Sequence, residues 1–159
     1  MVRIIGLDLG TKTGYAWTDD GKIRSINSGY WDLTPGRGEG GGMRFLRFRK
    51  LLSDLVEDPK DTAIFFEEVA PQAHRGGNAS HVYGGFLGIL TAFCESKEIP
   101  YRGIPISHVK REACGKGNAG KPLVLAAAYS KFGPVESEDA ADALWTLAVG
   151  VKELGSEQR

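Results

Sequence analysis

The chain has 159 residues with 20 basic and 20 acidic side chains, 42% hydrophobic residues and a formal net charge of zero. This composition is typical of one soluble folded domain, and it excludes disordered and low-complexity proteins. No apolar run approaches the roughly 20 residues of a membrane helix, no signal-peptide pattern is present, and Cys94 and Cys114 are isolated, so we expect a cytoplasmic protein without a membrane partner.

Hydrophobic periodicity and turn residues predict a series of strands and helices. In chain order these are a strand at 2–9, two strands within 14–33, a helix at 43–58, a strand at 62–69, a helix at 79–97, a strand at 99–104, and helices at 107–114, 121–131 and 136–154. This order predicts an α/β fold. We expect a mixed sheet of about five strands, the first three antiparallel and the others parallel additions, with helices on its faces.

Several connections carry predictions of their own. Asp20-Gly21 is a two-residue turn signal that would join the second and third strands as a hairpin. The glycine-rich stretch 35–42 predicts a flexible loop, and Ser107 is placed to cap the helix that starts there. Because no linker or repeat interrupts the pattern, residues 1–159 predict a single domain that ends in a disordered tail at 155–159.

Charge is distributed unevenly along the chain. Residues 44–50, RFLRFRK, and residues 102–121 are rich in lysine and arginine, whereas residues 136–142 gather four acids. A balanced total therefore permits a basic surface beside an acidic pocket. An ordinarily solvated surface explains the same pattern, so charge alone assigns no partner. The phenylalanines of RFLRFRK recur at helical spacing and are expected in the core.

Asp8 lies in the predicted first strand, where a charged side chain is costly to bury unless it binds something. Taken alone, a structural cap at the strand end and a metal ligand explain it equally well. A nucleotide-binding loop does not, because Gly6, Gly10 and Gly14 recur every four residues, unlike the dinucleotide fingerprint, and no Walker lysine–serine pair is present. We therefore expect no nucleotide cofactor.

Two acids, Glu67 and Glu68, close the aromatic strand TAIFFEEV at 62–69. Side chains alternate between the two faces of a strand, so Glu67 shares a face with Phe65 and Glu68 shares a face with Phe66. We expect Glu67 to contribute to a site at the end of the strand and Glu68 to point into solvent.

Two further acids, Asp139 and Asp142, are three residues apart and therefore lie on one face of the predicted last helix. The alanines between and beside them would let that helix approach the sheet and bring both acids near Asp8 and Glu67. Four converging carboxylates repel one another unless cations separate them, and oxygen ligands favour Mg²⁺, with Mn²⁺ as a substitute. Because two such ions roughly 4 Å apart are the usual apparatus for phosphodiester hydrolysis, these four acids are the predicted catalytic and metal-binding residues.

Four segments resemble, in the same order, motifs of the RuvC-type Holliday junction resolvases within the RNase H-like nuclease superfamily: IIGLDLGTKTGYAW, FFEEVAPQAHRGGNAS, HVKREACGKGNAGK and EDAADALWTLA. The resemblance implies an RNase H-like fold, with Asp8, Glu67, Asp139 and Asp142 as ligands of two Mg²⁺ ions. It implies an endodeoxyribonuclease of DNA recombination, repair or replication that nicks opposed strands of a four-way junction. It also implies a homodimer supported by the helix at 79–97.

The residues expected to contact DNA are Lys110, Lys121, Arg111, Lys116, His74 and Arg75. Lys110 and Lys121 match the spacing of two junction-contacting lysines in the family, and the other cations are placed to neutralise phosphates or touch the junction. Ala70 is a departure, because the bacterial enzyme has there a phenylalanine that wedges against bases. The substitution bears on junction opening and sequence preference more than on cleavage.

Three alternative functions stay open. YqgF-type proteins of the same superfamily also begin with a DLGTK-like motif and are linked to RNA processing, but their last motif differs from EDAADAL. An actin-like or sugar-kinase-like ATPase shares the DxGTxxG loop but needs two such domains and a second phosphate motif. A non-catalytic branched-DNA-binding module would have a degenerate acidic site, whereas all four acids are present here.

Overall fold

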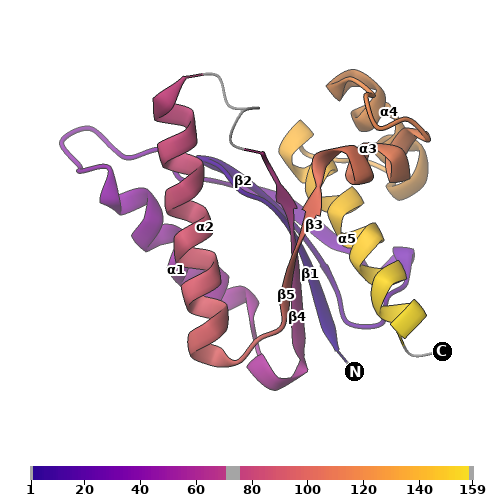
Figure 1. Cartoon of the computed structure of the whole chain (residues 1–159), viewed down its shortest axis with the longest axis horizontal. Coiled ribbons are helices and arrows are strands. Elements are labelled where there is room, and N and C mark those ends of the chain that lie inside the picture. Colours follow the sequence, from indigo (N-terminus) through magenta and orange to yellow (C-terminus); the bar gives the residue numbers. More distant parts are fainter. Residues whose placement is uncertain (1, 71–75, 158–159) are drawn as a thin grey trace.

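The structure is a computed structural model that describes residues 2–70 and 76–157. Five strands form one mixed sheet in the order β3-β2-β1-β4-β5 (Figure 1). The strands are β1 (Arg3–Asp8), β2 (Lys12–Thr18), β3 (Asn27–Asp32), β4 (Thr62–Glu68) and β5 (Tyr101–Pro105). The pairs β1–β2 and β2–β3 are antiparallel, and the pairs β1–β4 and β4–β5 are parallel. The predicted mixed sheet is therefore confirmed.

Helices cover both faces of the sheet (Figure 1). α1 (Gly42–Leu55) and α2 (Gly77–Lys97) pack on one face, and α3 (Ile106–Cys114), α4 (Lys121–Phe132) and α5 (Glu138–Glu157) pack on the other. Two short 3-10 helices, η1 (Ile23–Ser25) and η2 (Pro59–Asp61), lie in connections. Across the described residues, no helix combines the length and the apolar character that crossing a membrane requires.

Each face of the sheet has its own apolar cluster. β1 and β4 are buried on both faces, so their side chains alternate between the clusters: Ile4 and Phe65 lie beneath α5, and Ile5 and Leu7 lie beneath α1 and α2. Phe48 of the RFLRFRK segment is completely buried, as predicted. Burial of each such side chain contributes about 1.5–3 kcal/mol, so the two clusters hold the helices firmly on the sheet.

The main chain of α5 touches the sheet at two glycines. A Cβ atom placed on Gly6 of β1 would lie 2.6 Å from the carbonyl oxygen of Ala143, and one on Gly14 of β2 would lie 1.9 Å from that of Asp139. Only a residue without a side chain allows this approach. The predicted close packing of the last helix is therefore confirmed, and glycines on the strands permit it together with alanines on the helix.

The predicted two-residue hairpin at Asp20-Gly21 is wrong. Residues 19–26 separate β2 from β3 and include η1. The Asp20 carboxylate accepts hydrogen bonds from the backbone amide of Lys22 (2.9 Å) and from the Ser25 hydroxyl. Such local side-chain bonds compete with regular strand pairing, and here they stabilise the wider connection.

Two helix ends also differ from prediction. α3 begins at Ile106 directly after β5, and Pro105, rather than Ser107, occupies the N-cap position, so no side chain caps this end of the helix. α5 continues to Glu157, so residues 155–157 of the expected disordered tail are helical. Ion pairs from Arg102 of β5 to Glu153 and Glu157 hold this last stretch of helix.

Residues 35–41 of the glycine-rich segment form a loop that leads into α1, and Gly42 is already the first residue of that helix. The Glu39 carboxylate accepts hydrogen bonds from the amide of Gly36 (2.5 Å) and from the guanidinium of Arg47 (2.9 Å). One acidic side chain therefore links this loop to the helix that follows it.

Candidate active site

Three carboxylates meet at the edge of the sheet where β1 and β4 end. Asp8 is the last residue of β1, and Glu67 in the parallel strand β4 lies one position beyond the Leu7–Phe66 pair. Asp142 is carried by α5, which packs across both strands. Each of the three offers a carboxylate oxygen, and these oxygens lie within 4.8 Å of one another. The structure thus brings together three of the four predicted acids.

Strand alternation directs Glu67 into this group. Phe65 belongs to the apolar cluster beneath α5, and Phe66 belongs to the cluster beneath α1 and α2. Glu67 therefore points to the α5 side of the sheet, where it is only 7% exposed, and Glu68 is exposed on the other side.

The turn that follows Asp8 is held by hydrogen bonds on both sides. The Thr13 hydroxyl donates to the carbonyl oxygen of Gly10 at 2.6 Å, and the amide of Leu33 donates to the carbonyl oxygen of Thr11 at 2.7 Å. Groups that act on a substrate need such support from their surroundings, because a small displacement lowers their effectiveness.

The fourth predicted acid, Asp139, lies on α5 one turn before Asp142 but outside the group of three. Its main-chain carbonyl group lies against Gly14 of β2, which places the residue over the β1–β2 pair. Burial is the main cause that raises the pKa of Asp8, and the negative charge of Asp139 adds to it, after those of Glu67 and Asp142. Asp139 is therefore within electrostatic range of the group.

Burial and mutual repulsion oppose ionisation of the three clustered carboxyl groups. Burial, followed by the negative charge of Asp142, raises the pKa of Glu67 to about 7. Burial, followed by the charge of Glu67, raises the pKa of Asp8 well above its usual range, and burial also raises the pKa of Asp142. Three carboxylates in this arrangement are costly to ionise together unless a cation compensates them.

One oxygen in the group is left without a partner. Glu67 Oε2 is buried and has no hydrogen-bond partner within residues 2–70 and 76–157. An unpaired buried polar atom costs about 1–3 kcal/mol, and more when it is charged. Clustered carboxylate oxygens are the ligands that hard divalent cations such as Mg²⁺ and Mn²⁺ prefer, so the residues present fit the predicted metal centre.

Two lysines place positive charge near the acidic group. Lys121 Nζ lies 3.5 Å from Asp142 Oδ2. Burial lowers the pKa of Lys121, but the charges of Asp142, Asp8, Asp139 and Glu67 outweigh burial and raise it. Burial raises the pKa of Glu67, whereas the positive charges of Lys121 and Lys110 oppose that rise. Both predicted lysines therefore lie within electrostatic range of the site.

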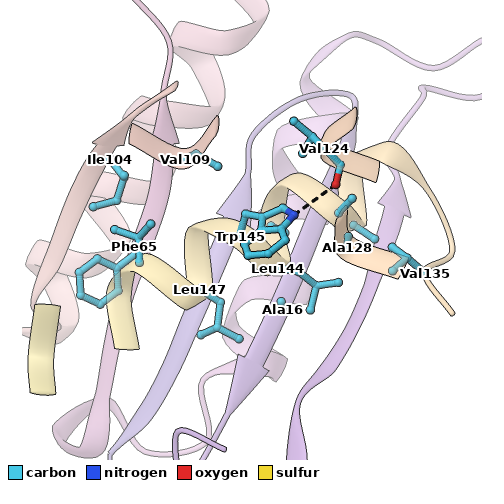
Figure 2. Packing of buried hydrophobic residues seen from close by; sticks show 14 of the residues in the cluster. Ala16, Phe65, Ile104, Val109, Val124, Ala128, Val135, Leu144, Trp145 and Leu147 are labelled. Carbon is cyan, nitrogen blue, oxygen red and sulfur yellow. Dashed lines mark hydrogen bonds between the residues drawn. The ribbon is translucent and has the colours of Figure 1, made fainter. Parts of the chain in front are cut away.

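The position of Lys121 follows from the way α4 packs on α5, which Figure 2 shows. The indole nitrogen of Trp145 donates a hydrogen bond to the carbonyl oxygen of Val124 at 3.2 Å. Trp145 lies about one turn after Asp142, and Val124 lies about one turn after Lys121. The hydrogen bond thus fixes the register between the two helices that sets Lys121 beside Asp142.

No protein-family model and no curated protein matches the chain by sequence. Solved structures match over nearly its whole length. A structure of Thermus thermophilus RuvC has a TM-score of 0.72 at 19% identity, with 97% of each chain covered. T. thermophilus RuvC in complex with Holliday junction substrate has a TM-score of 0.75 at 17% identity, with 99% of this chain and 96% of that chain covered.

A third match is the yeast mitochondrial Holliday junction resolvase, with a TM-score of 0.63, 12% identity and coverage of 99% of this chain and 80% of that chain. The chain has the RuvC fold. The predicted fold class, an RNase H-like α/β sheet flanked by helices, is thereby confirmed.

The other predicted DNA-contacting residues are placed as follows on this RuvC fold. Arg111 is exposed on α3, and Lys116 is exposed in the connection between α3 and α4. His74 and Arg75 lie outside the described residues. Ala70 is exposed just after β4, so no aromatic side chain stands at that position.

Gly6 and Gly14 are residues of the site that the sequence patterns did not assign. Together with Gly10 they recur every four residues, a spacing that excludes a nucleotide-binding loop but does not reveal their contact with the last helix. The signal that could have found them is strand alternation, because Gly6 shares a face of β1 with Asp8 and so faces the alanine-rich helix that carries Asp142. In the RuvC fold of this chain, small residues on the strands and on α5 let the helix reach the acidic edge of the sheet.

Proposed function

We propose that the protein is a metal-dependent, structure-selective endodeoxyribonuclease that resolves four-way DNA junctions by paired phosphodiester hydrolysis. The observation that carries the proposal is the group of three carboxylates from β1, β4 and α5. The RuvC fold supports the choice of substrate, since one solved structure with this fold is a complex with Holliday junction substrate.

Asp8, Glu67 and Asp142 would hold the metal, with Asp139 as a fourth ligand beside them. We infer two Mg²⁺ ions, for which Mn²⁺ would substitute. Such ions, when bound, supply an activated water and neutralise charge on the leaving 3′ oxygen. The unpaired Glu67 Oε2 and the raised pKa values of the carboxyl groups support this assignment, because a cation would relieve both.

Cations from α3 and α4 would bind the DNA backbone next to the acids. Burial raises the pKa of Glu67 and the positive charges of Lys121 and Lys110 oppose that rise, so both ammonium groups lie near it. A phosphate that reaches the metal would therefore also meet these ammonium groups. Exposed Arg111 and Lys116 would neutralise phosphates further along the strand. Each such contact releases counterions, so binding is expected to weaken steeply with salt.

Paired nicks in opposed strands need two acidic sites, so we infer a homodimer. The outer face of α2 suits this role: Gly84 and Gly88 are exposed, and a Cβ atom on either would meet nothing within 4 Å in the described structure. Small residues let two helices approach closely, as they do at other helix–helix contacts.

The experiment that tests the proposal is cleavage of a synthetic four-way junction in Mg²⁺. A linear duplex, an RNA–DNA hybrid and the Asp142→Asn variant are run beside it. The proposal predicts symmetric nicks in the junction alone, and none with the variant. If the protein cut only the hybrid or RNA, the metal site would still be supported, but the substrate would be that of a YqgF-like nuclease. Junction binding without cleavage in either Mg²⁺ or Mn²⁺ would assign a non-catalytic module.

A further inference from the structure

Arg44 in the first turn of α1 is attached to the turn that follows Asp8. One terminal nitrogen of its guanidinium donates a hydrogen bond to the Thr11 hydroxyl at 3.0 Å. Thr11 lies three residues after Asp8, so their Cα atoms are at most about 11 Å apart. Arg44 is therefore held beside the acidic edge of the sheet. Its helix, α1, packs on the face opposite to α3 and α4, the helices that carry Lys110 and Lys121 (Figure 1).

No carboxylate compensates the charge of Arg44 within residues 2–70 and 76–157. Two of the three other cations of α1 are paired: Arg47 binds Glu39, and Lys50 binds Asp54 at 2.8 Å. Arg44, by contrast, has a neutral hydroxyl as its hydrogen-bond partner, and no carboxylate forms an ion pair with it among the residues that the structure describes. Arg44 is half-buried, so part of the residue remains accessible to a ligand.

This placement is also unfavourable for the helix itself. The first turn of α1 has no acidic residue and no side-chain cap, and a positive charge there opposes the helix dipole. A fixed guanidinium with free donors suits an oxygen anion, and it can bind a phosphate through two parallel hydrogen bonds.

We propose that Arg44 binds a backbone phosphate of the DNA strand cut at the acidic site, from the side of the sheet opposite to Lys110 and Lys121. The inference rests on the proposed function for the identity of the DNA. Because Arg44 is held at the turn that follows Asp8, this phosphate would lie close along the strand to the one at the acidic site. The strand would thus be held by cations from both helical layers.

The test is the salt dependence of binding to a fluorescent synthetic four-way junction in EDTA, where no strand is cut. Arg44→Gln is expected to lower the slope of log K against log salt by about 1, the value for one phosphate, and to weaken binding about eightfold at 0.1 M salt. Arg44→Lys keeps the charge and is expected to restore the slope. The matched control is Arg49→Gln, since Arg49 lies on the same helix but borders a groove with Phe93 and Ser96 near the far end of α2.

Thr11→Val separates phosphate binding from support of the Asp8 turn, because it removes the hydrogen bond and leaves the arginine. The proposal expects the slope of this variant to stay near that of the wild type. It is overturned if Arg44→Gln changes the slope no more than Arg49→Gln does, or if only Thr11→Val weakens binding. A wild type that binds no junction refutes the proposed function instead, and with it the DNA named here.

Discussion

The substitution Glu67→Gln separates what the acidic group does for stability from what it does for activity. The pKa of Glu67 is raised from 4.5 to about 7, so between these values the folded metal-free protein holds a proton that the unfolded chain has released. Ionising Glu67 in the folded state is thus unfavourable, and the metal-free protein loses stability as the pH rises through this window. From pH 5 to pH 8 the loss is about 2.5 kcal/mol, at 1.36 kcal/mol for each pKa unit.

Glutamine removes this ionisation while keeping the shape of the side chain. We expect Glu67→Gln to melt about 5–10 °C above the wild type at pH 8 in EDTA, and close to it at pH 5, since 1 kcal/mol moves Tm by about 2–4 °C at this chain length. The same variant should have no nuclease activity. Thermal melting followed by circular dichroism, at several pH values in EDTA, measures the effect.

The matched control is Glu68→Gln, the same change at the neighbouring, exposed position on the other side of the strand. It is expected to alter Tm by little at either pH. If Tm changed with pH in the same way for the wild type and Glu67→Gln between pH 5 and pH 8, the three carboxylates would not lie together in solution as they do in the structure. The proposed metal centre would then lose its main support.

Metal, packing and assembly give three further tests. Mg²⁺ at 100 times its Kd should stabilise the wild type by about 2.7 kcal/mol, and an equal effect on Asp142→Asn would contradict the ligand set. Gly14→Ala should cost about 3 kcal/mol or more by thermal melting, because its methyl group would collide with the main chain of α5, whereas Gly155→Ala meets open space and should change stability by less than about 1 kcal/mol. Equal Tm values for these two variants would refute the close approach. In analytical ultracentrifugation the wild type should sediment as a dimer and Gly84→Leu as a monomer with an unchanged fold, and a monomeric wild type would refute the assembly.

The hydrophobic pattern of the strands and the spacing along the last helix were sufficient to locate most of the acidic group. Asp8 and Glu67 were recognisable because acids at the ends of apolar strands are rare, and parallel strands end at one edge of a sheet. Asp142 followed from helical spacing on an alanine-rich helix. The same spacing did not distinguish it from Asp139, because residues three apart share a face but differ by about 4.5 Å along the axis. Only the packing of α5 decides which of them joins the group of three.

The features that sequence could not supply depend on particular side-chain contacts. The hairpin prediction failed because the Asp20 carboxylate binds Lys22 and Ser25, a competition that a dipeptide turn signal does not include. The contact between Arg44 and Thr11 joins residues 33 positions apart, and no periodicity relates them.

The contact of α5 with Gly6 and Gly14 has a consequence for how this protein can change over time. The separation between Asp8 and Asp142 is limited by one main chain that rests on another at Gly6 and Gly14, so it depends less on the apolar side chains of the cluster than a contact between side chains would. Replacements among those side chains are expected to change the distance between the two acids little. Larger residues at Gly6 or Gly14 would instead move the helix directly and separate the acids.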